Sequence, residues 1–185
     1  MKTTILTIDD IVKQFRRNIK KQKYQFQKTI EGVQLLDLKL HPAEDGYFLE
    51  LARIDKKNII KNLSEFTVKQ ISYSITNPGG IKAWHLHYKQ EDVWIVPPDN
   101  RILVGLYDLR INSPTKGVSM KIILGDFQGK LLFIPRGVAH GYANLSTKPS
   151  AIIYLTNNDF DPNNPDEQRL PWDLFGKDFW EIKKG

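Results

Sequence analysis

Two histidines stand one residue apart in the stretch GGIKAWHLHYKQED, which covers residues 79–92. This stretch reads as a β-strand, and successive side chains of a strand point to opposite faces, so Ala83, His85 and His87 share one face. Two imidazoles beside a small alanine are poor packing material for a core. They suit a polar cavity, where histidine acts as an acid, a base or a metal ligand. A single histidine is usually hydrogen-bonded or exposed to solvent, but a pair with a third histidine at His140 favours a functional site.

The elements that would hold these histidines are short strands. From residue 33 onward the chain carries runs such as VQLLDLKL, VKQISYSIT, RILVGLYDLR and AIIYLT, which are rich in β-branched and aromatic residues. Turn sequences such as NPGG, PPDN, SPTKG and GDFQG separate the runs. This pattern predicts an all-β sandwich or barrel. We expect the aromatic residues of the C-terminal tail, PWDLFGKDFWEIKKG, to dock on it.

The N-terminal part has a helical period instead. Apolar residues recur there at three- and four-residue spacing, and Thr7 with Asp10 suits a capping box. We therefore expect an amphipathic helix of roughly residues 8–22 that packs its apolar stripe on the barrel or on a partner; the stripe contains Ile8, Ile11, Val12, Phe15 and Ile19. The predicted organisation is an N-terminal helical extension, residues 1–27, followed by one barrel domain, residues 28–185.

Composition excludes several classes of protein. The net charge of +6 lies in residues 1–30, and basic and acidic residues balance in the rest, which is typical of a solvated helix face, so we expect no nucleic-acid partner. No apolar run reaches the length of a membrane span and the N-terminus does not resemble a signal peptide, so we expect a cytoplasmic protein with no membrane partner. The chain has no cysteine, which leaves His, Asp and Glu as the strong metal ligands.

Two glycine-containing motifs resemble those of the cupin superfamily of small jelly-roll β-barrels. The first cupin motif matches Gly79, His85, His87 and Glu91, although Pro98 stands where its last glycine is expected. The second motif is matched throughout, by Gly129, Pro135, Gly137, His140 and Asn144. The resemblance implies a cupin-type barrel in which the two motifs face each other. It argues for the fold more strongly than for any chemistry, because cupins host many functions.

A narrower resemblance covers residues 29–182. IEGVQLLDLKLHPAEDGYFLEL, YDLRINSPTKG and IPRGVAHGYANLS are similar to segments of the dTDP-4-dehydrorhamnose 3,5-epimerase family, cupins that act on nucleotide-linked 4-keto sugars. This resemblance implies that His87 is the catalytic base and Tyr154 the catalytic acid. It implies that the substrate is bound by Phe48, Glu50, Trp84, His85 and His140.

The chemistry suits these residue types. A 4-ketone acidifies the hydrogens on the carbons beside it, so an imidazole can remove one proton and an acid on the opposite ring face can return it. Inversion follows from two groups on two faces. The enolate oxygen must also be stabilised, which is usually the larger energetic contribution.

Four positions depart from the family pattern. Trp84 and Asp45 each stand where the family has an arginine. The lysine expected after the histidine strand falls near Asp92 or Val93. The C-terminal Ser-X-Lys-Asp segment, whose aspartate pairs with the basic histidine, is not found. These departures leave the identity of the sugar and of the nucleotide open.

A metal site is the competing hypothesis. His85 completes a set of cupin metal-ligand positions, namely His85, His87, Glu91 and His140. Three imidazoles and a carboxylate would suit Zn, Fe, Mn or Ni, and the ion could stabilise the enolate as a Lewis acid. A His87 that binds a metal cannot also be the free base, so the two hypotheses compete for one residue. The family resemblance itself implies that no cofactor is required.

Three functions therefore stay open from the sequence: an epimerase or isomerase of a nucleotide-linked 4-keto-6-deoxy sugar, a metal-dependent cupin enzyme on another small substrate, and a sugar-binding module without turnover. Members of the resembled family are dimers. The strand face that carries Trp84, Leu86 and Tyr88 is apolar and points away from the histidines, and such a patch seldom stays exposed. We therefore expect a homodimer in which a second subunit covers this face.

Overall fold

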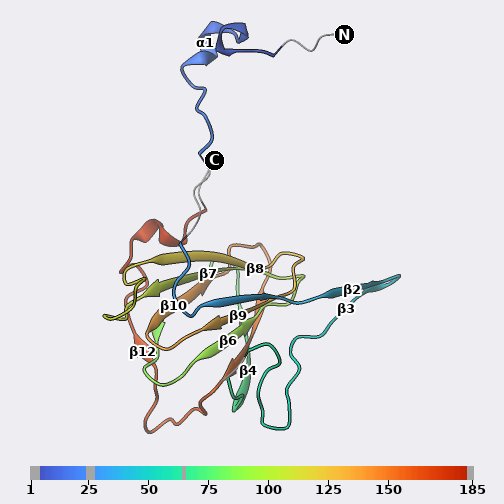
Figure 1. The fold of residues 1–185 in the computed structure, drawn as a ribbon, viewed down its shortest axis with the longest axis vertical. Coiled ribbons are helices and arrows are strands. Elements are labelled where there is room, and N and C mark those ends of the chain that lie inside the picture. Colours follow the sequence, from blue (N-terminus) through green and yellow to red (C-terminus); the bar gives the residue numbers. More distant parts are fainter. Residues whose placement is uncertain (1–4, 24–27, 64–65, 183–185) are drawn as a thin grey trace.

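The structure is a computed structural model, and it describes residues 5–23, 28–63 and 66–182 (Figure 1). Its strands are β1 Gln34–Asp37, β2 Leu40–Ala43, β3 Gly46–Leu49, β4 Gln70–Thr76, β5 Ile81–Leu86, β6 Asp92–Ile95, β7 Arg101–Asp108, β8 Ser119–Gly125, β9 Lys130–Ile134, β10 Val138–Ala143, β11 Ser150–Thr156 and β12 Gln168–Arg169. The helical segments are a 3-10 turn η1 Ile8–Asp10, a short helix α1 Lys13–Arg16 and a 3-10 turn η2 Lys177–Trp180.

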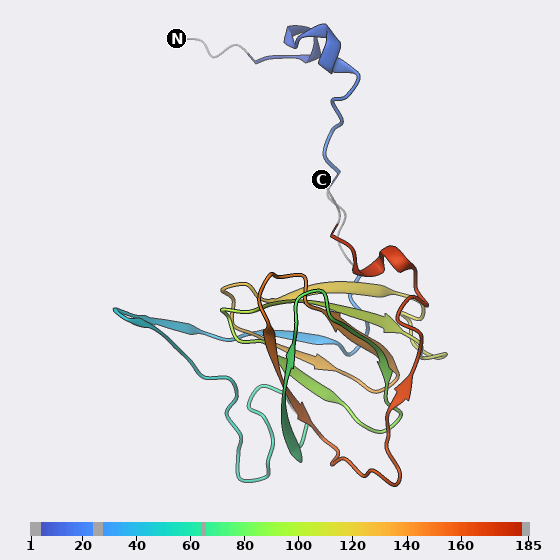
Figure 2. The same ribbon diagram turned by 180° about the vertical axis from the view of Figure 1, so that it is seen from behind.

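Two sheets form the barrel. In the described residues, five antiparallel strands in the order β1-β9-β6-β11-β4 make one sheet, and five in the order β12-β5-β10-β7-β8 make the other. Strands β2 and β3 pair only with each other and form a hairpin, which we call the arm; it projects from the barrel in both views (Figures 1 and 2). The all-β, cupin-type barrel expected from the sequence is confirmed.

The hydrophobic core lies between the two sheets. Leu132 and Ile152 of the first sheet pack in one cluster with Val104, Leu106 and Leu124 of the second, and all five are fully buried. Strand periodicity explains this arrangement, because every second residue of these strands points inward. The same core cluster includes Trp94 and Tyr142, which also line a polar cavity. The apolar core therefore forms the floor of that cavity.

The C-terminal tail covers the outer face of the second sheet. Phe175 stacks on Tyr107 with ring centroids 3.8 Å apart, and Phe179 and Trp180 lie 4.9 and 4.8 Å from the ring of Trp84. Gly105 makes room for this contact, because a Cβ there would lie 2.5 Å from the Phe179 ring. The expectation that the tail docks on the barrel is confirmed.

This docking corrects the interpretation of Trp84. The sequence correctly predicts that Trp84 points away from the histidines, but the chain's own tail buries it, and no second subunit is needed for that purpose. On the same face Leu86 is half-buried against the tail cluster, and Tyr88 is 64% exposed. The apolar patch on which the homodimer was predicted is therefore largely closed within one chain.

The N-terminal segment differs from the expected helix. Thr7 and Asp10 do form a capping box, but it starts only the 3-10 turn η1, and α1 is four residues long. Ile8, Phe15 and Ile19 are about half exposed, and α1 lies away from the sheets (Figures 1 and 2). The prediction of one helix over residues 8–22 is wrong, and the apolar stripe does not pack on the barrel of its own chain; packing on a partner stays a prediction. An isolated helix of about 12–15 residues is marginal from propensity alone and needs packing to persist.

The predicted domain boundary near residue 27 lies next to residues 24–27, which are outside the described residues. None of the helices in the described ranges combines the length and the apolar character that crossing a membrane requires.

Candidate active site

A cavity of about 410 Å³ opens between the two sheets. The first sheet lines it with side chains of β4, β6 and β11, the second with side chains of β5, β10 and β12, and the segment 158–167 adds to one side. On β4 the inward residues Gln70, Ser72 and Ser74 are polar, and the alternate residues Ile71 and Tyr73 point outward and are exposed. This reversed alternation gives the cavity its polar wall.

His87 follows the end of β5 and is buried in this cavity. Its Nδ1 contacts the backbone carbonyl oxygen of Asp166, which can only accept a hydrogen bond. The proton of the neutral ring therefore sits on Nδ1. The opposite nitrogen, Nε2, lies 3.3 Å from the amide nitrogen of Gln90, which donates to it. His87 thus has its acceptor nitrogen, Nε2, on the cavity side, where a general base needs it.

Asp166 holds the loop that contains His87. Its carboxylate accepts hydrogen bonds from the backbone nitrogens of Tyr88, Lys89 and Gln90 at 3.0, 2.7 and 2.7 Å. Burial alone would raise the pKa of Asp166, but these three N–H donors outweigh it and hold the pKa below its ordinary value. One residue therefore fixes both the backbone and the ring orientation of His87.

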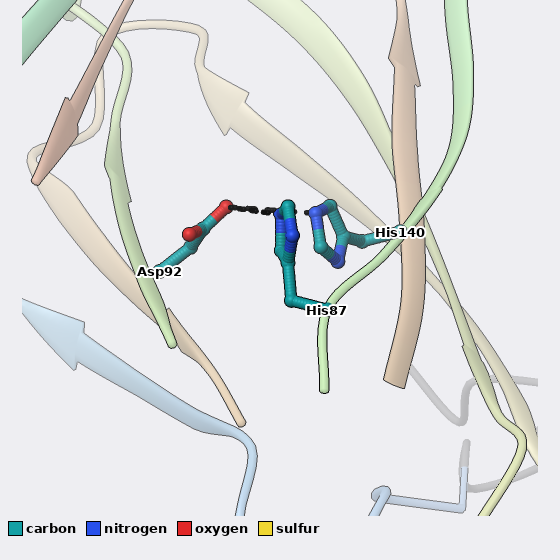
Figure 3. Close-up of side chains that lie close together, drawn as sticks. All are labelled: His87, Asp92 and His140. Carbon is teal, nitrogen blue, oxygen red and sulfur yellow. Dashed lines mark ion pairs between the residues drawn. The ribbon is translucent and has the colours of Figure 1, made fainter. Parts of the chain in front are cut away.

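A buried carboxylate, Asp92, faces two neighbouring imidazoles, those of His87 and His140, from one side (Figure 3). Its Oδ2 is 3.8 Å from His87 Nε2 and 3.5 Å from His140 Nε2. Trp94 Nε1 and Gln90 Nε2 donate to the same carboxylate at 3.1 and 2.8 Å. Asp92 would therefore stabilise the positive charge that His87 acquires when it takes up a proton.

His140 is held by β10, which pairs with β5 in the second sheet. Its Nδ1 donates to the carbonyl oxygen of Val138 at 3.0 Å, and its Nε2 has no hydrogen-bond partner among the described residues. Burial lowers the pKa of His140, so its ring stays neutral. Its lone pair points toward the same region as that of His87.

Tyr154 enters the cavity from β11, on the sheet opposite to β5. Its hydroxyl donates to the hydroxyl of Tyr142 at 2.9 Å, and Thr76 donates to Tyr142 at 3.1 Å. Burial and the donated hydrogen bond raise the pKa of Tyr154 well above its ordinary value. For Tyr142 burial would raise the pKa, but the hydrogen bonds from Thr76 and Tyr154 outweigh it and lower the pKa. Tyr154 is therefore kept protonated, as an acid must be.

His87 and Tyr154 thus reach one cavity from opposite sheets of the barrel. Residues 27–174 match the family model of dTDP-4-dehydrorhamnose 3,5-epimerase. The chain belongs to the dTDP-4-dehydrorhamnose 3,5-epimerase family.

Individual members of the family agree with this assignment. The chain is 43% identical to the spore coat polysaccharide biosynthesis protein SpsL of Bacillus subtilis, over 78% of this chain and 91% of that protein. It is 33% identical to the probable low-salt glycan biosynthesis epimerase Agl13 of Haloferax volcanii, over 78% and 90% of the two chains. The crystal structure of a dTDP sugar isomerase from Desulfovibrio desulfuricans superposes with a TM-score of 0.68 at 32% identity, over 78% and 87% of the two chains. Epimerases of this type work without a metal ion, which supports the expectation that no cofactor is required.

Within this epimerase barrel, the predicted metal-ligand set is only partly brought together. Glu91 faces elsewhere: its carboxylate pairs with Arg136 at 3.1 Å and accepts from Asn157 at 3.0 Å. His85 does line the cavity, but its Nε2 accepts from Arg169 at 2.7 Å. Burial, together with the nearby charge of Arg169, lowers the pKa of His85 to about 3. The carboxylate beside His87 and His140 is Asp92, so the prediction of Glu91 as a ligand is wrong.

The predicted substrate-binding residues also separate. His85 and His140 line the cavity, whereas Trp84 is buried under the tail on the other face of β5. Phe48, which is 65% exposed, and Glu50, which pairs with Arg53 at 2.7 Å, belong to the arm and the residue that follows it. Neither is among the described residues that line the cavity of their own chain. The placement of Trp84 corrects its predicted role in substrate binding.

Sequence reasoning missed Asp92, Tyr142, Asp166 and Gln90 as parts of the site. A signal existed for Asp92, because alternation along DVWI places it on the same face as Trp94, and both line the cavity. None existed for Asp166, which contacts His87 through a backbone carbonyl from a segment without strand or helix periodicity. The family pattern has an orienting aspartate that is not found in this chain, and a backbone oxygen contacts His87 in its place.

Proposed function

We propose that the protein is an epimerase that inverts a carbon beside the ketone of a dTDP-linked 4-keto-6-deoxy sugar. The observation that carries the proposal is the placement of His87 and Tyr154 in one cavity, on elements of opposite sheets. The contact of His87 Nδ1 with a backbone carbonyl oxygen leaves Nε2 as the nitrogen that can accept a proton, and burial raises the pKa of Tyr154. The family match supports it, since the model that matches is that of dTDP-4-dehydrorhamnose 3,5-epimerase.

The reaction needs two proton transfers. His87 Nε2 removes the proton from the carbon beside the ketone, and the electron pair moves to the ketone oxygen to form an enolate. Tyr154 then gives its hydroxyl proton to the opposite face of that carbon, and the enolate collapses to the ketone with inverted stereochemistry. The carboxylate of Asp92, 3.8 Å from His87 Nε2, stabilises the imidazolium that forms in the first transfer. Solvent then takes up the proton of His87 and returns one to the tyrosinate of Tyr154, which restores the enzyme.

The negative charges of the substrate need cations. Among the described residues that line the cavity, the basic side chains are Lys82, whose ammonium donates to Ser74 at 2.9 Å, and Arg169, which is exposed. Both belong to the second sheet, on β5 and β12. The lysine and the arginine of the family pattern are absent here. We therefore propose that Lys82 and Arg169 together stabilise the negative charges of the diphosphate and of the enolate oxygen.

The substrate-binding roles of Phe48 and Glu50 require a second copy of the chain. Phe48 lies on β3 of the arm and Glu50 follows it, and neither is among the described residues that line the cavity of their own chain. The arm itself projects away from the barrel (Figure 2). We propose that the protein is a homodimer in which the arm of one subunit brings Phe48 and Glu50 to the cavity of the other. The composition supports a cytoplasmic enzyme, because a chain without cysteine needs no oxidising compartment.

Solvent deuterium exchange tests the function directly. The purified protein is mixed with a dTDP-4-keto-6-deoxyhexose in D2O, and deuterium at the carbons beside the ketone is followed by NMR. We expect exchange in the wild type and a loss of about 10²–10⁴-fold in His87→Asn and in Tyr154→Phe. Glu91→Gln is the matched control, since Glu91 would be a ligand in a metal-dependent cupin but lies outside this mechanism. Normal exchange in both site variants would overturn the proposal.

A further inference from the structure

We propose that His87, Asp92 and His140 also form a binding site for a divalent cation of the zinc type, and that the bound ion inhibits the enzyme. The binding site stands on geometry alone. The inhibition rests on the proposed function, because the ion would occupy the nitrogen that removes the substrate proton.

The distances among the three side chains suit a metal better than hydrogen bonds. One ligand atom from each residue lies within 4.8 Å of the others, and all three residues are buried (Figure 3). The Asp92 Oδ2 to Nε2 distances of 3.8 and 3.5 Å exceed the range of about 2.7–3.2 Å for an N–H···O hydrogen bond. Ligand bonds of about 2.0–2.2 Å in a tetrahedral zinc site place neighbouring ligand atoms about 3.3–3.5 Å apart. The site is therefore close to that spacing.

The surroundings of both imidazoles are those of metal ligands. His87 Nδ1 is bound to the carbonyl oxygen of Asp166, and His140 Nδ1 donates to that of Val138 at 3.0 Å. A backbone carbonyl on the far nitrogen is the usual partner of a metal-binding histidine, because it leaves the other nitrogen as the donor atom. Both Nε2 lone pairs face Asp92, which supplies a negative charge.

One of these nitrogens has no partner. His140 is 2% exposed, and its Nε2 makes no hydrogen bond within the part of the chain that the structure describes. A buried acceptor without a partner costs free energy and calls for an explanation. A cation held between Asp92 and the two histidines would satisfy it.

The position already attracts positive charge. The amide nitrogen of Gln90 lies 2.8 Å from Asp92 Oδ1 and 3.3 Å from His87 Nε2, so the positive end of an amide dipole fills part of the space. A metal ion would replace this nitrogen after rotation of one flexible side chain. The three proposed ligands, His87, Asp92 and His140, already lie close together.

The donor set selects the class of ion. Two imidazole nitrogens and one carboxylate oxygen suit Zn²⁺ and related first-row ions, and zinc binds tighter than manganese or iron at such sites. Three protein ligands leave one tetrahedral position for a water on the cavity side. Because His87 Nε2 has a single lone pair, the ion and the substrate proton compete for it.

Calorimetric titration of chelator-treated, full-length protein with Zn²⁺, with Co²⁺ visible absorption as a second probe, tests the site. We expect one ion per chain. The variants His140→Gln and Asp92→Asn should each lower the zinc affinity by more than about 10–100-fold, the loss caused even by outer-shell changes. Glu91→Gln should bind like the wild type. Circular dichroism and thermal unfolding show which of the two variants is folded. The zinc affinity of a folded variant then tests the site.

The inhibition has its own readout. Zn²⁺ should reduce turnover of the wild type, and EDTA should restore it. At the same Zn²⁺ concentration, His140→Gln should keep a larger fraction of its metal-free turnover than the wild type keeps. Wild-type affinity that persists in a folded His140→Gln or Asp92→Asn variant would overturn the site. Tight binding at the site without inhibition would overturn the competition for His87 and would leave the cation site standing. Exchange activity in metal-free protein tests the proposed function separately.

Discussion

The hydroxyl of Tyr154 donates a hydrogen bond of 2.9 Å to the hydroxyl of Tyr142, which joins the two sheets that form the cavity. Tyr142→Phe removes this acceptor but leaves the acid, so we expect turnover to fall about tenfold or less, the value of one neutral hydrogen bond. Tyr154→Phe should lose about 10²–10⁴-fold. Deuterium exchange and steady-state rates measure both.

Thr76→Val is the matched control for Tyr142, because it removes the other donor to that hydroxyl and keeps the tyrosine pair. A Tyr142→Phe variant as impaired as Tyr154→Phe would contradict the assignment of Tyr154 as the acid.

Asp166 orients His87 through its loop, so Asp166→Ala should lower kcat although its side chain is no acid or base in the mechanism. Three backbone N–H groups lose their acceptor, and a shift of the base by about 1 Å can cost about 10²-fold. Asp166→Asn keeps one oxygen acceptor and should lose less. Steady-state kinetics with thermal unfolding measures both, and a fully active, stable Asp166→Ala protein would refute the role.

Asp108 predicts an acid-dependent stability. It is fully buried and accepts hydrogen bonds from Arg110, Ser113 and Thr115. Burial would raise the pKa of Asp108, but these hydrogen bonds outweigh it and hold the pKa far below its ordinary value. Since the pKa is lower in the folded state, the stabilisation is complete above about pH 4 and is lost as the pH falls toward the folded pKa.

We therefore expect Asp108→Asn to lower the free energy of unfolding at pH 7 by about 2–3 kcal/mol, below the value for a fully buried pair because Arg110 is partly exposed. Urea unfolding between pH 4 and pH 2 should show a steeper loss for the wild type than for the variant. Asp126→Asn, which breaks an exposed pair with Arg101, should change stability by no more than about 1 kcal/mol. Parallel pH profiles for wild type and Asp108→Asn would rule this account out.

The tail should stabilise the barrel without serving catalysis. Trp180 is 3% exposed and packs on Trp84, so Trp180→Ala should lower the free energy of unfolding by about 3–5 kcal/mol. The rate per folded molecule should not change, because the tail lies on the face of β5 away from His87. Trp172→Ala is the control, since that side chain is 46% exposed and its contact with Trp84 uses a backbone oxygen. A Trp180→Ala variant that loses turnover at unchanged stability would contradict a purely stabilising role of the tail.

The arm predicts complementation between subunits. The arm of Phe48→Ala lacks the side chain that would reach the other subunit, and His87→Asn lacks the base. The homodimer of each variant should therefore have a lower turnover than the wild type. A mixture refolded or co-expressed together should recover part of the activity, because mixed dimers contain one intact cavity with one intact arm. Sedimentation should show a dimer, and a monomer at micromolar concentration or a mixture without recovery would exclude a shared site.

The sequence by itself determined the strands, the face of each side chain and the two cupin motifs, because these depend on local periodicity and on turn residues. The resemblance to the epimerase family predicted that His87, His140 and Tyr154 share one site, and all three line one cavity. Alternation placed His85 toward the cavity and Trp84 on the opposite face. These inferences need only a period of two and the antiparallel closure of a barrel.

Tertiary structure decided what each of these residues contacts. Glu91 and Asp92 are adjacent, and the start of β6 at Asp92 turns one carboxylate toward the histidines and the other toward Arg136. Trp84 needed a cover, but only the path of the tail shows that the cover comes from the same chain.

Asp166 illustrates the limit most clearly, because it orients His87 through a backbone oxygen 79 residues away in the sequence. Every residue carries that same carbonyl, so no pattern of side chains can predict which one the histidine will meet. Local periodicity sets the direction of a side chain, whereas long-range packing of irregular segments selects its partner.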